Sequence, residues 1–495
     1  MTASATPGAA PRIDRRYPAS RLVKDRAVFE LARVDGKKRL LVETPDGRTP
    51  DGLETETSQG GACPAVCPLT PANSAWMRRA FPHLAPTANP GRSNSIGLGD
   101  RLGKAASGHL QALAGLPVFP VLAQQSMREL RLTGRTYEEV LAAATWAVLE
   151  TGWKDGFGAD GDHLKTGEEL DYALGCGFTM ITLDCSDHID KALATLPDAE
   201  IHARYLLLPA PEREDLEARY LAGGEPRLAE LGVSMDRPGF ERRVLTYRGA
   251  IAHSVDMYAT RIAKSDRKLD FEVSIDETAT VTSPADHVFV ALELLRRGVR
   301  PMSIAPRFCG EFQKGVDYRG DLAQFQVEFA AHAAIARRLG YRVSVHSGSD
   351  KFLVFPIVGK EAPEGFHLKT AGTHWLEALR VLSAHEPAMF REILRVALAS
   401  LPDARNFYHI SGVAENVAPE ASLADAQLPG LLDQDDARQI LHITYGHVLR
   451  TAEPDGGTLG DRLHAALDRL EPEYAAGIAR HLKRHTDGLG LRRGA

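Results

Sequence analysis

One pattern recurs eight times between residues 117 and 412: a short apolar run, then a polar cluster, then a stretch with helical spacing of its apolar residues. Strands that alternate with helices and stop after eight units predict an α/β fold, a (β/α)8 barrel of the TIM type. In that fold the chemistry lies where the strands end. The runs predicted as strands are residues 117–125, 156–166, 177–188, 270–278, 300–308, 341–350, 365–375 and 406–412.

The segments outside this repeat give the predicted domain organisation. Residues 1–90 are predicted as an N-terminal extension, partly disordered because its first residues are rich in Ala, Pro, Thr and Arg. Within it, residues 22–44 are predicted as a β-hairpin that turns at an Asp-Gly pair. The catalytic barrel is predicted over 91–450, and C-terminal helices over 451–495.

Two segments of the barrel region depart from the repeat. Residues 190–245 are interpreted as a helical insertion after the third predicted strand, of the kind that covers an active site. The glycines of residues 93–103 are interpreted as a loop at the mouth of the barrel, because no Lys-Ser/Thr pair follows at phosphate-binding spacing.

Composition narrows the class of partner. The chain has 495 residues and a net charge of −6, and no basic stripe stands out, which argues against a nucleic-acid partner. No apolar run is long enough to span a bilayer, and the first residues lack the apolar core of a signal peptide. Five cysteines without a zinc-ribbon spacing fit a reducing compartment. We therefore expect a cytoplasmic protein that acts on a small molecule; a homo-oligomer is left open.

Imidazoles follow several of the predicted strands. Alternate residues of a barrel strand face the lumen, and on this parity His346 faces inward at the end of the sixth predicted strand. His163, His374 and His409 lie at the ends of three others. Any single histidine is more often a surface or core residue than a ligand. Several imidazoles at one mouth nevertheless suit a divalent metal such as zinc, nickel, manganese or cobalt.

Carboxylates supply the candidate acid and base. Asp162 and Glu277 come from separate strands, so they are placed to take a proton on one face of a substrate and return one on another. Parity places Asp276 inward and Glu277 on the turn, and this pair is also typical of a helix N-cap.

Cations make the mouth basic within an acidic protein. Lys165, Arg307, Lys351 and Lys369 all lie near strand ends, and they favour an anionic substrate such as a sugar acid. Arg307 is inward by parity and is the better bidentate partner for a carboxylate, so it is the first choice for that contact.

Four motifs resemble one family. HSGSDKF (346–352), HLKTAGTHWLEALR (367–380), FYHISG (407–412) and ADGDHLKT (159–166) are similar to the tagaturonate epimerase family, with the resemblance extending over about residues 90–450. The resemblance implies interconversion of D-tagaturonate and D-fructuronate in hexuronate catabolism, with a divalent metal.

The resemblance also implies roles for particular residues. Asp162 is the implied proton acceptor and Glu277 the implied proton donor. The implied metal ligands are His163, His346 and His374, and His409 is an alternative to one of the three. Contacts to the substrate are expected from Lys165, Asp276, Arg307, Ser347 and Lys369.

Rival functions share these features. The inverted carbon is β to the ketone, so its hydrogen is not acidic, and retro-aldol cleavage followed by re-addition is the expected route. A metal-dependent class II-type sugar aldolase would use the same fold and metal, and its products would be cleavage fragments. A Schiff-base enzyme using Lys165 or Lys369 would be trapped by borohydride. A sugar-acid-binding regulatory barrel is the non-enzymatic alternative.

Overall fold

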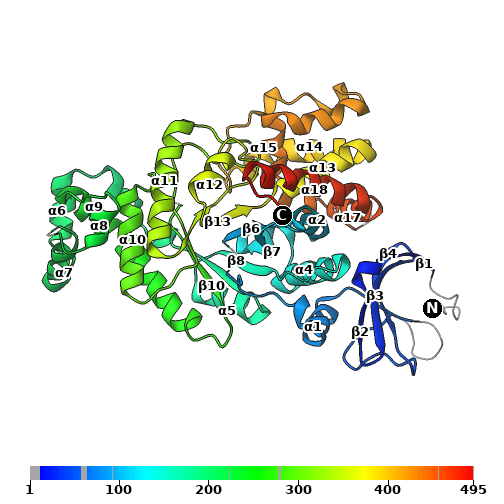
Figure 1. Cartoon of the computed structure of the whole chain (residues 1–495). Helices are drawn as coiled ribbons and strands as arrows, with labels where there is room; N and C mark the ends of the chain where they lie inside the picture. Colours follow the sequence, from blue (N-terminus) through cyan, green and yellow to red (C-terminus); the bar gives the residue numbers. More distant parts are fainter. Residues whose placement is uncertain are drawn as a thin grey trace.

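Eight parallel strands close into a barrel in the computed structural model, which describes residues 12–56, 64–91, 93–221, 223–276, 280–454 and 456–493. The strands lie around the barrel in the order β10-β11-β12-β13-β6-β7-β8-β9, with helices outside them (Figure 1). The (β/α)8 fold is therefore confirmed. The strands are β6 (Asn94–Leu98), β7 (Val118–Ser126), β8 (Gly158–Leu164), β9 (Met180–Asp184), β10 (Asp270–Ser274), β11 (Ser303–Ala305), β12 (Arg342–Val345) and β13 (Phe366–Thr370).

One predicted strand was wrong, and one strand was missed. Residues 406–412 form no strand; the barrel is closed instead by β6, which pairs with both β13 and β7. The glycines that suggested a loop have a packing reason: a Cβ on Gly97 would fall 1.5 Å from the Gln124 side chain in the lumen. Since β6 comes first in the chain, each predicted strand is one position later in the barrel than expected.

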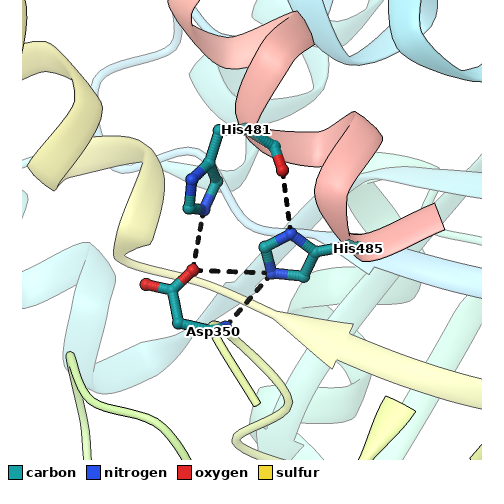
Figure 2. Close-up of side chains that lie close together, drawn as sticks. All are labelled: Asp350, His481 and His485. Atoms are coloured by element: carbon teal, nitrogen blue, oxygen red, sulfur yellow. Dashed lines mark hydrogen bonds and ion pairs between the residues drawn. The ribbon is translucent and has the colours of Figure 1, made fainter. Parts of the chain in front are cut away.

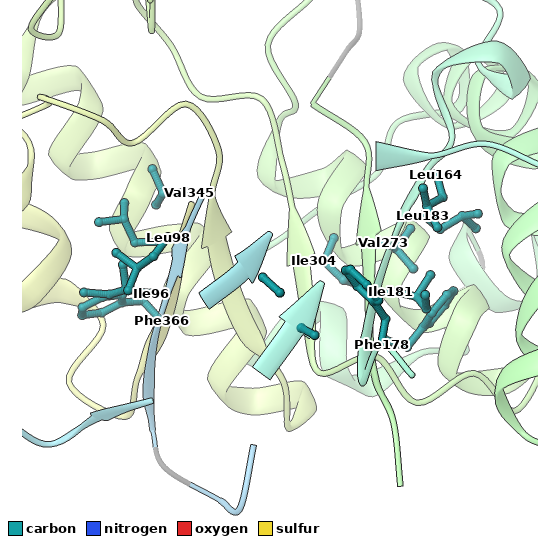
Figure 3. Close-up of a cluster of buried hydrophobic side chains, with 14 of the residues drawn as sticks. Ile96, Leu98, Leu164, Phe178, Ile181, Leu183, Val273, Ile304, Val345 and Phe366 are labelled. Atoms are coloured by element: carbon teal, nitrogen blue, oxygen red, sulfur yellow. The ribbon is translucent and has the colours of Figure 1, made fainter. Parts of the chain in front are cut away.

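Strand residues divide sharply between the two sides of the barrel wall. Apolar side chains point outward against the helices, as Figure 3 shows for Ile96, Ile181, Val273, Ile304 and Phe366, among others. The inward positions are polar or charged although they are almost fully buried: Ser95, Asp160, Thr182, Glu272, Ser303, Ser344, His367 and Lys369. Barrel lumens are usually filled by branched aliphatic residues. A charged lumen costs folding free energy unless its groups pair, and it marks where function is to be sought.

The barrel helices follow from amphipathic sequence and capping. Helix α4, for example, begins after a capping box formed by Thr136 and Glu139 and ends at Gly152, which has φ 65°. The helices packed around the barrel are α2 (Ala106–Leu113), α3 (Met127–Thr133), α4 (Tyr137–Thr151), α5 (Gly167–Cys176), α10 (Pro284–Arg296), α11 (Leu322–Leu339), α12 (Phe355–Glu361) and α13 (Thr373–His385).

Two groups of helices are added to the barrel (Figure 1). The insertion after the third predicted strand is confirmed as a helical element between β9 and β10: α6 (Asp198–Tyr205), α7 (Ala210–Tyr220), α8 (Pro226–Glu230) and α9 (Arg237–Met257). The C-terminal part contributes α14 (Pro387–Ala404), α15 (Asp435–Ile443), α16 (Tyr445–Arg450), α17 (Leu459–Arg469) and α18 (Glu471–Gly488). None of the helices in the described ranges has the length and apolarity that a membrane span requires.

The N-terminal region forms a separate antiparallel sheet, with strand order β1-β3-β4-β5 and β2 paired to β3. Its hairpin of β3 and β4 turns at Asp35 and Gly36, whose φ angles are 48° and 76°. Helix α1 (Pro71–Ala80) links this sheet to the barrel. The strands are β1 (Ile13–Arg16), β2 (Leu22–Lys24), β3 (Ala27–Val34), β4 (Lys37–Glu43) and β5 (Ala65–Cys67).

Glu471 ties this sheet to helix α18. Its carboxylate lies 2.6 Å from Lys38 Nζ, and it accepts hydrogen bonds from Tyr17 Oη at 2.7 Å and Arg33 at 2.5 Å. Burial alone would raise the pKa of Glu471, but Lys38 and the hydrogen bonds from Lys38, Tyr17 and Arg33 lower it to about 2.

Glu471→Gln is expected to lower the free energy of unfolding by about 2–3 kcal/mol at pH 7. Because the folded-state pKa is depressed, this stability is present above the unfolded value near 4.5 and is lost as the pH falls toward 2. In urea unfolding at pH 7, 4 and 3, the difference in the free energy of unfolding between wild type and variant should become smaller as the pH falls. Glu473→Gln, an exposed position of the same helix, is the control. An equal gap at pH 7 and pH 3 would contradict the assignment.

Candidate active site

Lys369 lies at the centre of a buried ion cluster inside the mouth of the barrel. Its Nζ lies 2.7 Å from Asp162 Oδ1, 2.8 Å from Asp160 Oδ2 and 3.0 Å from Glu272 Oε1, and it also contacts the Thr182 hydroxyl. These side chains come from β13, β8, β10 and β9, so the barrel wall itself sets the geometry. One cation among three carboxylates leaves the cluster negatively charged.

The cluster shifts the pKa values of the two aspartates of β8 in opposite directions. Burial raises the pKa of Asp160 to about 6, although Lys369 opposes this. Burial would also raise the pKa of Asp162, but Lys369, His163 and His346 hold it below its usual value. Two carboxyl groups whose environments separate their pKa values are typical of acid–base sites. Asp162 is thus the ionised member, suited to accept a proton.

Two histidines stand beside these carboxylates. His346 Nε2 lies 2.7 Å from Glu272 Oε1, and its Nδ1 lies 3.3 Å from Asp276 Oδ2. Burial lowers the pKa of His346, but Asp276 and Glu272 more than offset this and raise it to about 10. The His163 ring packs edge-on to His346 with centroids 4.9 Å apart. His163 has φ 53° at an irregularity in the β8–β9 pairing, and this backbone turns both Asp162 and His163 toward the mouth.

The donors at this point fit a divalent cation. Nδ1 of His163 is buried without a hydrogen-bond partner among the described residues, and Nδ1 of His346 is held only by its ion pair with Asp276. Imidazole nitrogen and carboxylate oxygen are ligands that zinc, nickel, manganese and cobalt accept. Glu272 and Asp276 are the carboxylates paired with the His346 ring, and Asp162 Oδ1 lies 3.8 Å from His163 Nε2. A cation here would also offset the negative charge that Lys369 leaves unmatched.

The other predicted site residues are dispersed. His374, the second residue of α13, turns away from the mouth: its Nδ1 bonds the Gly99 carbonyl at 2.5 Å and its ring packs on His109. Lys165 pairs with Asp187 at 2.8 Å near the surface. Arg307 and His409 are exposed and line a neighbouring cavity with Asp276. Glu277 lies outside the described residues.

Ser347 borders both cavities. The main cavity is lined by Asp162, His163, His346 and Lys369, together with Arg128, Lys314, Tyr408 and His442. The neighbouring cavity shares His346, Ser347 and Gln313 with it. His346 and Ser347 therefore lie between the catalytic cavity and the side where Arg307 is found.

A second group of buried side chains has ligand atoms close enough to hold a metal: Asp350, His481 and His485, within 4.8 Å of one another (Figure 2). Hydrogen bonds occupy both ring nitrogens of His485, and an ion pair joins His481 to Asp350. Nε2 of His485 accepts from the Asp350 backbone N–H, and its Nδ1 donates to the His481 carbonyl. His481 Nε2 lies 2.9 Å from Asp350 Oδ1, and Arg438 pairs with Oδ2. We interpret the group as a latch between helix α18 and the loop after β12.

Lys351 continues this latch. It is 1% exposed and donates from Nζ to the carbonyls of Gln313, Val316 and Ser349 at 2.5–2.9 Å. Burial lowers the pKa of Lys351 to about 7, yet three acceptors require the three hydrogens of an ammonium. The cation predicted at the mouth thus fixes two loops and has no hydrogen left for a substrate.

Four charged residues of the site were not selected from the sequence. Glu272 and Asp160 lie in β10 and β8 on the same parity as Asp276 and Asp162, so the period-two pattern could have identified them. Lys314 lies in the loop after β11 and Arg128 at the start of α3, where no periodicity applies.

An eight-stranded barrel with a buried lysine–carboxylate cluster and two histidines at its mouth defines an acid–base enzyme of the TIM-barrel class. The model of the tagaturonate epimerase family, UxaE, matches residues 17–489. The chain belongs to this family, which confirms the resemblance drawn from the four motifs, and it is an enzyme of the isomerase class.

Relatives agree with this membership over nearly the whole chain. The tagaturonate/fructuronate epimerase of Thermotoga maritima is 41% identical over 479 residues, which is 96% of each protein. The glycerol-complexed crystal structure of the fructuronate-tagaturonate epimerase UxaE from Cohnella laeviribosi superposes with a TM-score of 0.92 at 42% identity, covering 97% of both chains. The native crystal structure of that enzyme gives 0.91 at 42% identity over 96% of both.

Proposed function

We propose that this enzyme interconverts D-tagaturonate and D-fructuronate. The observation that carries the proposal is the Lys369 cluster: an ionised Asp162 held against an ammonium, beside two histidines, in the barrel of an epimerase family. The named relatives act on this pair of sugar acids. The substrate is a small sugar acid.

The two sugar acids differ at a hydroxyl-bearing carbon β to the ketone, so direct removal of its hydrogen is not favoured. We infer a retro-aldol route. The bond between the α and β carbons breaks, its electron pair passes to the ketone fragment as an enediolate, and the β-hydroxyl proton passes to Asp162. After the aldehyde turns its other face, the same steps in reverse form the inverted centre. Glu277, the proton donor implied by the resemblance, would act from the opposite face.

His163 and His346, with Asp276 beside the His346 ring, are the residues that would hold a divalent cation. When bound, it would supply Lewis-acid polarisation of the substrate's ketone. The protein's own task is to keep Asp162 ionised through Lys369 and to exclude water by burying the cluster.

The test is turnover of purified enzyme with D-tagaturonate, with D-fructuronate as the expected product. Asp162→Asn is expected to lower kcat by about 10²–10⁴-fold while the protein stays folded, as for loss of a general base. Asp187→Asn, at an exposed pair with Lys165, is the matched control. Net accumulation of three-carbon fragments by the wild type would indicate an aldolase instead, and binding without turnover would indicate a regulatory barrel.

A further inference from the structure

The main cavity is lined by side chains of both charges. Asp162 and Lys369 of the buried cluster line it, and so do Arg101, Arg128 and Lys314. We propose that Lys314 and Arg128 form the subsite for the substrate's carboxylate and hold the carboxylate-bearing fragment while its aldehyde turns over. This inference rests on the proposed function.

Arg101 and Lys314 differ in how their charges are matched within the protein. Arg101 pairs with Glu129 at 3.0 Å and stacks on Tyr445, so its charge is neutralised within the protein. Lys314 donates from Nζ to the Ser347 hydroxyl at 2.9 Å, a neutral partner. Burial, and then the neighbouring Arg128, lower the pKa of Lys314. An anion placed between Lys314 and Arg128 would offset the cost of burying the Lys314 ammonium. It would also offset the repulsion between the two cations.

Lys314 is held in place rather than free on the surface. The carbonyls on either side of it are fixed: Gln313 O accepts from Lys351 at 2.9 Å, and Gly315 O accepts from Arg438 at 2.8 Å. The Gln313 side chain accepts from Gln439 at 2.8 Å. Because the backbone of this loop is already fixed, the Lys314 amine can bind a substrate without a large entropy cost for ordering the loop.

One more polar side chain, that of His442, lines the same cavity. His442 is fully buried, and neither ring nitrogen has a hydrogen-bond partner among the described residues. Burial holds its pKa well below the usual value, so the ring is neutral and offers one donor and one acceptor. Such a group is suited to hydrogen bonds with the hydroxyls of a sugar. It indicates that this cavity binds a polar ligand.

The cations favoured from sequence are less suitable. Lys369 is occupied by three carboxylates, Lys351 by three carbonyls and Lys165 by Asp187. Arg307 is exposed and borders the neighbouring cavity, beyond His346 and Ser347 from the Lys369 cluster. It remains the rival site for the carboxylate, and the experiment below separates the two.

The position of the subsite matters for the outcome of the reaction. In these sugar acids one carbon separates the carboxyl carbon from the inverted carbon. Cleavage therefore leaves the carboxylate on the aldehyde fragment, the one that must turn its face. An anchor at the carboxylate allows the aldehyde to rotate about the adjoining carbon–carbon bond while keeping the fragment in the cavity. The same chemistry without an anchor would release the fragments, as an aldolase does.

The experiment compares Lys314→Met, Arg128→Met and Arg307→Met with the wild type on D-tagaturonate. Loss of one charge-assisted hydrogen bond is expected to lower kcat/KM by about 10- to 150-fold for the first two, mainly through KM. Lys314→Arg should restore most of it. A hydrazine reagent should trap more three-carbon aldehyde acid from Lys314→Met than from wild type. Lys360→Met, on the exposed face of α12, is the neutral control.

Two results would overturn the proposal: unchanged kinetics in both Lys314→Met and Arg128→Met, or a loss confined to Arg307→Met. A second measurement keeps it separate from the proposed function. D-Fructuronate should raise the melting temperature of the wild type, neutral D-fructose should not, and the effect should shrink in Lys314→Met. Uronate binding that depends on Lys314 in a protein without turnover would leave the subsite standing and refute the epimerase; binding that is unaffected in Lys314→Met would refute the subsite.

Discussion

Lys369→Met is expected to lower kcat/KM by about 10³–10⁵-fold. The ammonium is the shared counter-ion of Asp160, Asp162 and Glu272. Without it, these carboxyl groups would retain protons at neutral pH, because buried charges cannot remain unpaired. Asp162 would then lose its ability to accept the hydroxyl proton.

The measurement is steady-state kinetics with D-tagaturonate, together with circular dichroism to show that the barrel is folded. Lys360→Met replaces an exposed lysine by the same residue and should behave as wild type. Activity within tenfold of wild type in a folded Lys369→Met protein would refute the role of this cluster. Borohydride with substrate gives an independent check: trapped protein at Lys369 would indicate Schiff-base chemistry instead.

His346→Ala and His163→Ala are each expected to lose bound divalent metal and to lower activity by about 10⁴-fold or more, while the fold is retained. The reason is that these two rings place imidazole nitrogens at the mouth, and Nδ1 of His163 has no hydrogen-bond partner among the described residues. Metal content by elemental analysis is the primary readout, so the result does not depend on an activity assay. A chelator should abolish turnover in the wild type, and added metal should restore it.

His385→Ala, at an exposed position at the end of α13, is the matched control and should keep its metal. Full metal occupancy in the His346→Ala protein would refute the assignment of His346 as a metal ligand. His374→Ala tests the third ligand implied by the resemblance. Metal loss there would support His374; retention there with loss in Asp276→Asn would identify Asp276, which lies 3.3 Å from the His346 ring.

Much of the barrel could be predicted from sequence because its pattern is local. Strand parity placed His346 inward and Lys369 was expected near a strand end, and both lie at the mouth. Strand β6 was missed because Gly97 and Gly99 suggested a loop, whereas Gly97 is required by the close approach of Gln124. A packing constraint between two strands cannot be read from either strand alone.

The candidate site could be predicted only in part. Asp160 and Glu272 were not chosen as site residues, and both lie deeper in the lumen, where apolar residues are the usual expectation. His374 was placed at the mouth because it follows a strand, but the left-handed turn at Gly372, with φ 81°, begins a helix that directs its ring toward His109. Loop residues such as Lys314 depend on tertiary clamps, which no spacing rule reports.

The latch between Asp350 and helix α18 also bears on when the enzyme becomes active during synthesis. All eight barrel strands precede α18 in the chain, so the barrel can close before His481 and His485 are made. The loop after β12, which carries His346 and Ser347 to the cavity and Lys351 to the Lys314 loop, would then still lack its outer support. A chain still bound to the ribosome could therefore have a closed barrel in which the loop after β12 is not yet supported. Its turnover would begin only after α18 has docked.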